Sequence, residues 1–236
     1  MALPKIEHPT FDVRLPSNKK KIKLRPFLVK EEKILLMAMQ SEDTEEIINS
    51  IKQVINNCIV TEKIDVDELA TLDLEYLFIK LRARSVNNVI SLSYRDLEDN
   101  KKYDVEVNLD DVEIRYDEKH TNNIKINDSI GIILKYPTAN VSSQIKDVKT
   151  ETELFFKILK NCLDIIYESD NQYKVSDSTE AEIDEFLQSL DVKAFNKIQD
   201  FFTTMPKMHY EVKYVNSNGN ERVIVLSTLN DFFTLG

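Results

Sequence analysis

Strict alternation of apolar and polar residues marks the first two elements of the chain. Residues 11–15 read Phe-Asp-Val-Arg-Leu and residues 20–25 read Lys-Lys-Ile-Lys-Leu-Arg, with a short polar segment, 16–19, between them. A period of two is typical of a half-buried strand, and a polar segment between two such runs is typical of a turn. The pattern predicts an N-terminal β-hairpin that ends at Pro26 and has a basic exposed face.

Three segments with the helical spacing of apolar residues follow the hairpin. The first covers residues 28–40, the second is expected to begin with Asp43 as its N-cap, and the third begins near Thr71. In the first segment, the face predicted to point inward consists of Leu28, Leu35, Leu36 and Met39. The face predicted to point outward consists of Glu31, Glu32 and Lys33.

Alternating or continuously apolar runs predict antiparallel strands in the middle of the chain. The predicted strands cover residues 89–94, 102–108, 112–116 and 124–136. The last hundred residues return mainly to helical patterns. Their predicted elements are a helix from about 148 to 168, helices capped by Thr179 and Asp191, a hairpin around residues 216–220 and a short helix after Ser227. The predicted fold class is therefore α+β, with an N-terminal β-hairpin and helices, central antiparallel strands, and a helical C-terminal part with a β-hairpin.

Pro137 and the polar segment after it, residues 138–144, form the strongest boundary signal in the chain. A length of 236 residues is compatible with one large domain or two small ones. We expect two. Residues 1–137 would form an N-terminal α+β domain with the basic hairpin, and residues 138–236 a mainly helical C-terminal domain with a terminal hairpin.

Glycine is rare in this chain, which contains Gly131, Gly219 and Gly236 and no other. A dinucleotide-binding fingerprint needs three closely spaced glycines and a phosphate-binding P-loop needs two, so the sequence excludes both. Gly131 lies inside an apolar strand, where a glycine indicates a bulge or a close backbone approach. Gly219 is expected in a hairpin turn.

Few residues suit metal or nucleophilic chemistry. The three histidines, His8, His120 and His209, share no spacing typical of a metal site, and no Cys-x-x-Cys or His-Glu-x-x-His motif occurs. Ser17 and Lys20 match the bare Ser-x-x-Lys pattern of some acyl-enzymes, but they fall in a predicted turn rather than at a helix start. We therefore expect no catalytic residue, no metal and no cofactor.

A run of carboxylates in the middle of the chain is the strongest argument for catalysis. Its members are Asp104, Glu106, Asp110, Asp111 and Glu113. Such a cluster is compatible with a cation site or with a hydrolase that uses two carboxylates. Alternation with valines favours the solvated face of a sheet instead. A hydrolase that uses Asp104, Asp110 or Asp111 stays as an alternative.

Charge divides the chain into a basic head and an acidic body. Residues 1–40 carry nine Lys or Arg and four Asp or Glu, a net charge of +5, whereas the whole chain has a net charge of −10. The basic hairpin could contact nucleic-acid phosphates, dock onto an acidic protein or remain a solvated face. Because the total charge opposes non-specific binding to nucleic acid, we expect a protein partner and no nucleic acid.

A docking surface is expected on the hairpin, on a phenylalanine after it and on a terminal helix. Its candidate residues are Lys20, Lys21, Lys23, Arg25, Phe27, Phe232 and Phe233. The alternative for the paired phenylalanines is a place in the core. No apolar run approaches the length of about 20 residues that spans a bilayer, and no signal peptide is visible, so we expect no membrane association and a soluble, cytosolic protein.

Four segments of the chain resemble one protein family. They are residues 22–38, 73–85, 130–137 and 201–206. These segments are similar to the baseplate hub assembly family of T-even-like contractile-tailed bacteriophages, and the agreement in order covers nearly the whole chain. None of the four is catalytic, so the resemblance brings no active-site residues.

The resemblance implies a protein of phage tail morphogenesis that acts at the central hub of the baseplate, with other hub proteins as its partners. It implies a non-enzymatic, chaperone-like assembly factor in the host-cell cytoplasm or, alternatively, a stoichiometric structural subunit of the hub in the virion. Some relatives carry Cys-x-x-Cys pairs in their β-hairpins, but the corresponding turns here, residues 94–101 and 216–220, contain no cysteine. The sequence leaves the oligomeric state open.

Overall fold

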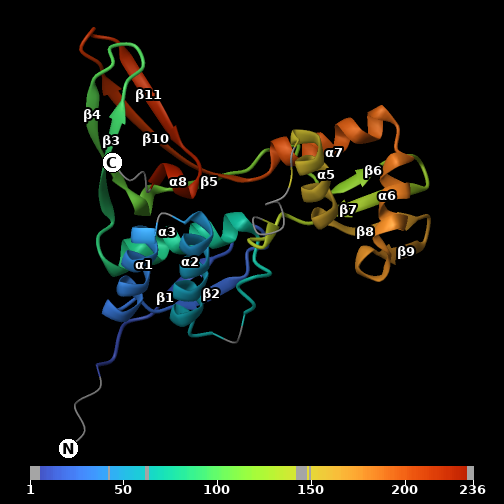
Figure 1. The fold of residues 1–236 in the computed structure, drawn as a ribbon, viewed down its shortest axis with the longest axis horizontal. Helices are drawn as coiled ribbons and strands as arrows, with labels where there is room; N and C mark the ends of the chain where they lie inside the picture. The colour runs from blue at the N-terminus through green and yellow to red at the C-terminus, as the bar shows by residue number, and fades with distance from the viewer. Residues whose placement is uncertain (1–5, 42, 62–63, 142–147, 149, 233–236) are drawn as a thin grey trace, which may run out of the picture. The chain divides into compact units, whose positions relative to one another are not determined.

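A computed structural model describes residues 6–41, 43–61, 64–141, 148 and 150–232 (Figure 1). The chain forms two compact units. The first unit combines residues 1–115 with residues 207–236, and the second consists of residues 116–206. The sequence predicts a division at residue 137, which lies inside the second unit. Pairing between strands that are distant in the sequence contributes to the limits of the units.

The predicted N-terminal hairpin is confirmed in the first unit. Strand β1 (Phe11–Arg14) pairs antiparallel with β2 (Lys21–Leu24). Apolar residues of β2 are buried and its polar residues are exposed. Ile22 and Leu24 are fully shielded from solvent, while their neighbours in β2 are exposed. One face of the hairpin therefore belongs to the core of the first unit and the other faces solvent.

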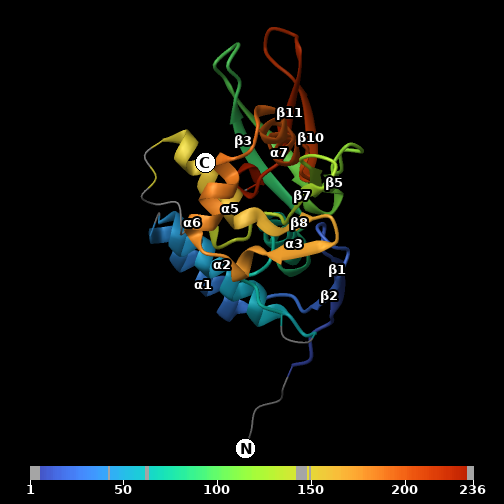
Figure 2. The same cartoon turned by 90° about the vertical axis from the view of Figure 1, so that its right-hand side faces the viewer.

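Three helices follow the hairpin in the first unit, as the sequence predicts (Figure 2). They are α1 (Val29–Ser41), α2 (Thr44–Cys58) and α3 (Thr71–Ser85). The side chain of Asp43 accepts hydrogen bonds from the backbone N–H groups of Glu45 and Glu46, which confirms the predicted N-cap of α2. Among the described residues, no helix is both long and apolar enough to cross a bilayer.

Two β-hairpins extend from these helices in both views of the first unit (Figures 1 and 2). One consists of β3 (Val89–Arg95) and β4 (Lys102–Asn108), and the other of β10 (Lys207–Val215) and β11 (Glu221–Leu226). The remaining elements are the 3₁₀ turn η1 (Leu109–Asp111), β5 (Glu113–Arg115) and α8 (Leu229–Phe232). Strand β5 pairs with β10, so the sheet has the order β11-β10-β5. Gly219 adopts a φ of +82° between β10 and β11, which confirms the predicted turn.

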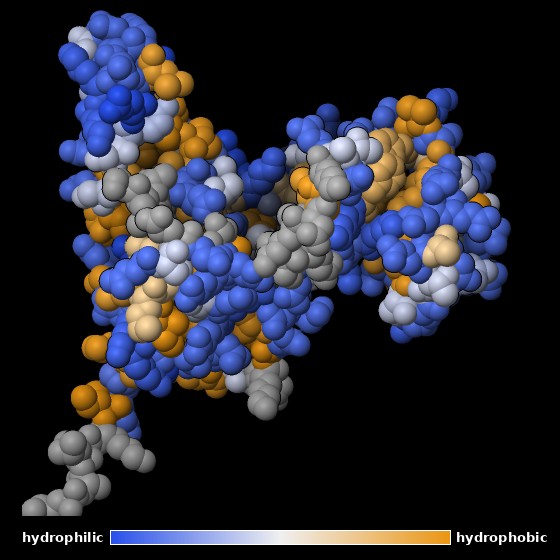
Figure 3. All heavy atoms as spheres, viewed as in Figure 1, coloured by the Kyte–Doolittle hydropathy of each residue, from blue (hydrophilic) through white to orange (hydrophobic). Residues whose placement is uncertain are grey.

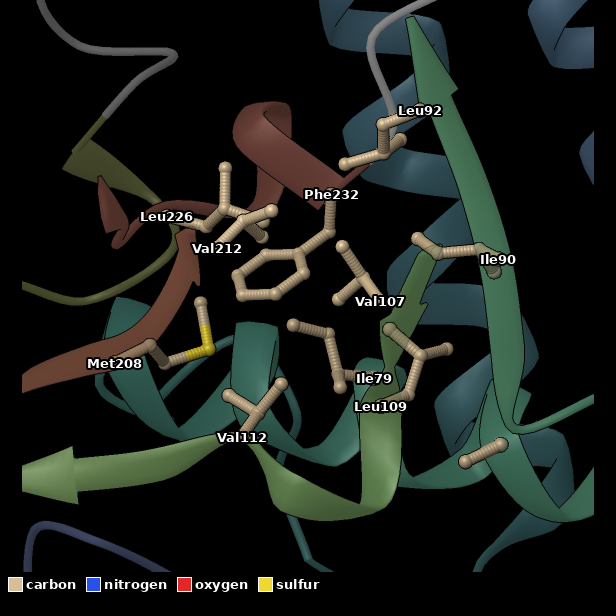
Figure 4. Close-up of a cluster of buried hydrophobic side chains, with 11 residues drawn as sticks. Ile79, Ile90, Leu92, Val107, Leu109, Val112, Met208, Val212, Leu226 and Phe232 are labelled. Carbon is tan, nitrogen blue, oxygen red and sulfur yellow. The ribbon is translucent and has the colours of Figure 1, made fainter. Parts of the chain in front are cut away.

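A buried apolar cluster joins the two hairpins to α3 and α8 (Figure 4). Ile79 of α3 and Phe232 of α8 lie among side chains from both hairpins, and Val107 of β4 and Met208 of β10 are completely buried. The cluster therefore combines residues from the first half of the chain with residues from its last thirty positions.

The turns of the two hairpins are tied to each other by a polar cluster. In the β3–β4 turn, Asp99 accepts hydrogen bonds from the backbone N–H and the hydroxyl of Ser217, at 3.0 and 2.8 Å. The neighbouring Glu98 accepts from the side-chain amide of Asn216 at 3.1 Å. Burial alone would raise the pKa of Asp99, but the hydrogen bonds from Tyr103 and Ser217 hold it far below its ordinary value. The two tips are therefore held together by charge-assisted hydrogen bonds.

In its described residues, the second unit contains a four-stranded antiparallel sheet and the helices α5 (Glu151–Cys162), α6 (Glu180–Gln188) and α7 (Val192–Thr204). Its strands, in the order of the sheet, are β6 (Asn123–Lys125), β7 (Ile130–Leu134), β8 (Leu163–Glu168) and β9 (Asn171–Lys174). The 3₁₀ turn η2 (Val175–Asp177) lies before α6. Ile132, Leu159, Ile198 and Phe201 are among the residues of its core.

Two predicted elements of the second unit are wrong, while its predicted caps are confirmed. The helix predicted to run to about residue 168 ends at Cys162, and residues 163–168 form β8 because this β-branched and aromatic segment pairs with β7. The strand predicted over residues 124–136 is divided into β6 and β7 by a turn in which Asn127 Oδ1 accepts from the N–H of Ile130 at 2.8 Å. The capping box before α6 and the aspartate cap of α7 are present.

Candidate docking surface

Four lysines of the N-terminal hairpin are exposed. They are Lys19, Lys20, Lys21 and Lys23. Because strand residues alternate, Lys21 and Lys23 lie on the face opposite the buried side of β2. The Nζ atom of Lys21 lies 2.8 Å from Oδ2 of Asp12, and this hydrogen bond lowers the pKa of Asp12. The four lysines outnumber this single aspartate, so the exposed face is basic, as the sequence predicts.

Arg25, the last candidate of the hairpin, lies inside the first unit instead of on this face. Its side chain is 17% exposed, and its Nη2 atom lies 2.9 Å from Oε1 of Glu31. The same nitrogen donates to the carbonyl of Asn57 at 2.9 Å. The structure therefore assigns Arg25 to the support of α1, because a buried carboxylate of that helix holds its guanidinium inward.

Glu31 is that carboxylate, and the prediction that it points outward is wrong because its side chain is completely buried. Its Oε2 atom accepts from the backbone N–H of Leu28 at 2.9 Å, which is the contact that a glutamate in the first turn of a helix makes with the N-cap. Burial alone would raise the pKa of Glu31, but the hydrogen bonds from Arg25 and Leu28 hold it below its ordinary value. The buried charge is thus paired and hydrogen-bonded.

Apolar residues of α1 are turned toward solvent. Leu36 and Met39, predicted to point inward, are 55% and 41% exposed, and Val29 and Met37 are 80% and 60% exposed. We call these four residues the α1 outer face. In Figure 3, orange apolar residues interrupt the blue hydrophilic surface where Figure 1 places α1. A helix with apolar residues on all sides is normally covered on all sides, so this face is suited to a partner.

One feature of the sequence, separate from the helical spacing of apolar residues, indicates the α1 outer face. Residues 34–39 are six consecutive apolar residues. Six consecutive positions in a helix point in all directions around its axis, so no single buried face can hold them. Such a run inside a helix therefore indicates exposed apolar side chains or a second covered face.

A cavity of about 330 Å³ opens beside α1. Its lining includes Leu35 and Met39 of α1, Ile47 of α2, Leu92 of β3 and Leu229 of α8. Met39 belongs to both the cavity lining and the α1 outer face. Cavities of this size and apolar character suit the side chain of a partner or a small apolar molecule.

The phenylalanines of the predicted surface are core residues where the structure describes them. Phe27 is 7% exposed, and its backbone N–H donates to the hydroxyl of Ser85 at 2.9 Å. Phe232 is 1% exposed and lies within the cluster of Figure 4. Phe233 lies outside the described residues. Burial of Phe27 and Phe232 removes them from the docking surface, because a fully packed ring has no area left for a partner.

The Ser-x-x-Lys segment is part of the hairpin turn. Ser17 donates its backbone N–H, at 2.9 Å, and its hydroxyl to the carboxylate of Asp73 in α3. Asp73 is 1% exposed, and burial raises its pKa although the hydrogen bonds from Ser17 oppose this. Both groups of Ser17 therefore anchor the turn to α3.

The carboxylates of the middle segment make separate local contacts. Asp104 accepts from a serine hydroxyl of the paired strand, and Asp111 accepts from an asparagine side chain at 2.8 Å. Asp110 lies 3.3 Å from an arginine of α3, while Glu106 and Glu113 are exposed on β4 and β5. The contacts give no pair of carboxylates aimed at a common point.

The histidines also lie in unrelated places. His8 is in the exposed segment before β1, and His209 lies 3.0 Å from Glu211. The Nδ1 atom of His120 lies 2.9 Å from the hydroxyl of Thr204, and burial lowers the pKa of this histidine. Within the described ranges, no group of three or more His, Cys, Asp or Glu is arranged to hold a metal ion.

Comparison with known proteins links the chain to a phage structure. The family model described as "T4 bacteriophage base plate protein" matches residues 8–234. No curated protein and no solved structure matches the chain.

Proposed function

The protein belongs to the T4 bacteriophage base plate protein family, and from this premise we propose that it acts at the central hub of the baseplate as a non-enzymatic assembly factor for hub subunits. Membership of the family means that it works with other baseplate proteins, in the phage tail or during assembly of the tail in the host. The proposal adds the place, the hub, and the role, which is to hold hub subunits in the host-cell cytoplasm until they associate.

The α1 outer face is the observation that carries the proposal. Four large apolar side chains on one helix are between 41% and 80% exposed. Exposed apolar residues with polar neighbours mark sites of protein association. Two of the four, Met37 and Met39, are methionines, whose flexible side chains adapt to partner surfaces of different shape. A factor that holds a subunit for a limited time needs a surface of this kind.

Exposed lysines on α1 and on the N-terminal hairpin indicate the chemistry of the partner. Lys30 and Lys33 lie on α1 itself, and Lys20 and Lys23 lie on the preceding hairpin. We infer that the hub subunit offers an apolar stripe bordered by carboxylates. Complementary charge would accelerate the encounter and set the orientation, while apolar contact would supply most of the affinity.

A non-enzymatic role is part of the proposal. The carboxylates Asp104, Asp110 and Asp111 each have local partners that fit a structural role. Burial raises the pKa of Cys58 to about 11 and that of Cys162 to about 12, so neither thiol is a thiolate nucleophile at neutral pH. Alanine replacement of the three aspartates is expected to leave plaque formation unchanged, and a loss with the fold intact would support the hydrolase alternative.

A binding experiment tests the docking surface. Leu36→Glu combined with Met37→Glu places two carboxylates on the α1 outer face, and we expect at least tenfold weaker co-purification with hub subunits. Val192→Glu is the matched control, because Val192 is 75% exposed at the start of α7 in the other unit. If the unmodified protein binds no hub subunit and tails assemble without it, the proposal is overturned.

A permanent structural subunit of the hub is the second candidate, because a lasting interface would also cover the α1 outer face. Quantitative mass spectrometry of purified virions separates the two. An assembly factor is expected to be absent or present far below the copy number of the hub subunits. Stoichiometric copies would replace the assembly-factor proposal by the structural one.

A further inference from the structure

Strand β11 is an edge strand whose last four residues lack the usual protection against pairing. In the described part of the first unit, the sheet order β11-β10-β5 leaves one side of β11 without a neighbouring strand. Natural edge strands carry charges, prolines or bulges that prevent pairing with another chain. Residues 223–226 of β11 are Val-Ile-Val-Leu, and the pairing with β10 runs in register from Tyr210↔Leu226 to Val215↔Glu221. Beyond Glu221 and Arg222, the strand is therefore regular, apolar and open at its edge.

The outer face of the β10–β11 hairpin is also more apolar than that of the β3–β4 hairpin. On β3 and β4, the exposed positions are serines and charged residues, among them Ser91, Lys102 and Glu106. On β11, Val223 and Val225 are 55% and 50% exposed. Ile224 and Leu226 point the other way and pack against the core cluster. The exposed valines thus add nothing to the core, and adjacent exposed apolar residues indicate an interface.

We propose that β11 pairs antiparallel with β11 of a second copy of this chain, about a two-fold axis at Ile224. Directly opposed residues of two antiparallel strands point to the same face of the sheet. An exposed valine of one copy can therefore lie opposite only a residue on the exposed face of the other copy. With the axis at Ile224, Val223 of each copy lies opposite Val225 of the other. The pairing would join two three-stranded sheets into one continuous six-stranded sheet.

The side chains of β11 favour this register and a second copy as the occupant. Besides the two valine pairs, the register places Glu221 opposite Ser227 and Arg222 opposite Leu226, so no like charges face each other. An axis at Val223 would instead place Glu221 opposite Val225. On its exposed face the strand is thus complementary to itself, because the axis at Ile224 pairs both exposed valines with valines of the other copy. An isologous contact of this kind forms a closed dimer.

The expected dimer is weak. A standard stable interface buries about 1,600 Å² of accessible surface, and a single pair of strands with one row of valines buries less. We therefore expect a monomer–dimer equilibrium that depends on protein concentration. The surface is separate from the α1 outer face, so the inference does not depend on the assembly role.

Register-specific cross-linking provides the first test. Val223→Cys and Val225→Cys are made as separate single variants of the full chain. Equal amounts are mixed at high concentration and oxidised gently. The mixture is expected to form the disulfide-linked dimer at least tenfold faster than either variant alone, because the pair is Val223 with Val225. The native Cys58 and Cys162 are completely buried. The unmodified protein, which contains only these two cysteines, measures the background rate of cross-linking.

Sedimentation equilibrium provides the second test. We expect the average mass of the unmodified protein to rise with concentration, and Val225→Lys to weaken dimerisation at least tenfold by placing a charge at the edge. Val192→Lys in α7 is the matched control, and circular dichroism verifies that each variant is folded. A monomer at every concentration with no cross-link in the mixture overturns the proposal. Self-cross-linking of Val223→Cys alone overturns the register, and loss of another baseplate protein from a monomeric Val225→Lys variant assigns the edge to that protein instead.

Discussion

Gly131 lies opposite Tyr167 in the β7–β8 pair, and the tyrosine ring fills the space that a side chain at residue 131 would need. A β-carbon at this position would lie 2.8 Å from Cε1 of the ring and closer still to Cζ and the hydroxyl oxygen. The hydroxyl donates to Asn123 Oδ1 at 2.8 Å, which fixes the ring over the glycine. The sequence predicts a bulge or a close backbone approach at Gly131, whereas the close approach in the structure is made by a side chain of the neighbouring strand.

Gly131→Ala is expected to destabilise the protein by about 1–3 kcal/mol, because Tyr167 must move and lose its hydrogen bond to Asn123. Urea unfolding monitored by circular dichroism measures the change. Tyr167→Ala provides the matched background. In that variant, Gly131→Ala should lower the free energy of unfolding by less than half as much as in the unmodified protein. Equal costs in both backgrounds would show that the ring does not determine the need for glycine.

Glu31→Gln is expected to destabilise the protein by about 3 kcal/mol, because it leaves the guanidinium of Arg25 buried without its ion-pair partner. The pKa of Glu31 is lowered from its ordinary value of 4.5. The carboxylate therefore contributes stability above about pH 4.5, and this contribution is lost as the pH falls through the lowered pKa. The variant should accordingly lose less stability than the unmodified protein between pH 5 and pH 3, as measured by thermal unfolding.

Glu32→Gln is the control for this experiment, since Glu32 is the exposed neighbour on the same turn of α1. We expect it to change the free energy of unfolding by less than about 0.5 kcal/mol. A similar effect of both variants would contradict a special role for the Arg25–Glu31 pair.

Glu75→Gln is expected to stabilise the protein at pH 8 and to leave it unchanged at pH 4. Burial, together with the nearby Asp231, raises the pKa of Glu75 to about 7 although the backbone N–H of Leu229 opposes the shift. A carboxyl group with a raised pKa costs stability as the pH rises from its ordinary value of 4.5 through 7. The gain at pH 8 is at most about 3.5 kcal/mol, at about 1.4 kcal/mol per pKa unit.

Urea midpoints of both proteins between pH 4 and pH 8 measure this effect. Glu106→Gln on the exposed face of β4 is the matched control. An equal stability difference between Glu75→Gln and the unmodified protein at all pH values would contradict the titration of Glu75.

Asp99→Asn is expected to loosen the contact between the two hairpin tips. The carboxylate accepts from both the N–H and the hydroxyl of Ser217, and one oxygen is replaced by a donor in the variant. Hydrogen exchange of residues 216–220 should become at least tenfold faster, with little change in the helices. Asp104→Asn, on the exposed face of the same hairpin, is the control, and equally fast exchange there would contradict the role of Asp99.

Local signals in the sequence predict the elements whose cause is local. The alternation of residues 11–25 identifies the first hairpin, and Asp43, Thr179 and Asp191 identify three helix starts, because a cap acts within one turn. The end of α5 at Cys162 is different, since the following residues suit a helix or a strand and only their pairing with β7 decides between the two.

The candidate surface is predicted only in part for a related reason. The alternation of apolar and polar residues in β2 is sufficient to predict that Lys21 and Lys23 are exposed. The inward orientation of Glu31 depends on its ion pair with Arg25. Arg25 lies before the helix, so helical spacing does not predict this contact. With Glu31 and Ala38 on the buried side of α1, Leu36 and Met39 are at the surface.

The first unit consists of two stretches of sequence separated by the entire second unit. On the ribosome, residues 116–206 emerge before β10 and β11 are synthesised, so the second unit is complete while the first still lacks two of its strands. During that interval Val107 and Ile79 have no cover from Met208 or Phe232. Residues of β10, β11 and α8 therefore complete a core that residues 79–112 begin, and a premature stop after the second unit leaves that core unfinished on a chain whose second unit is already folded.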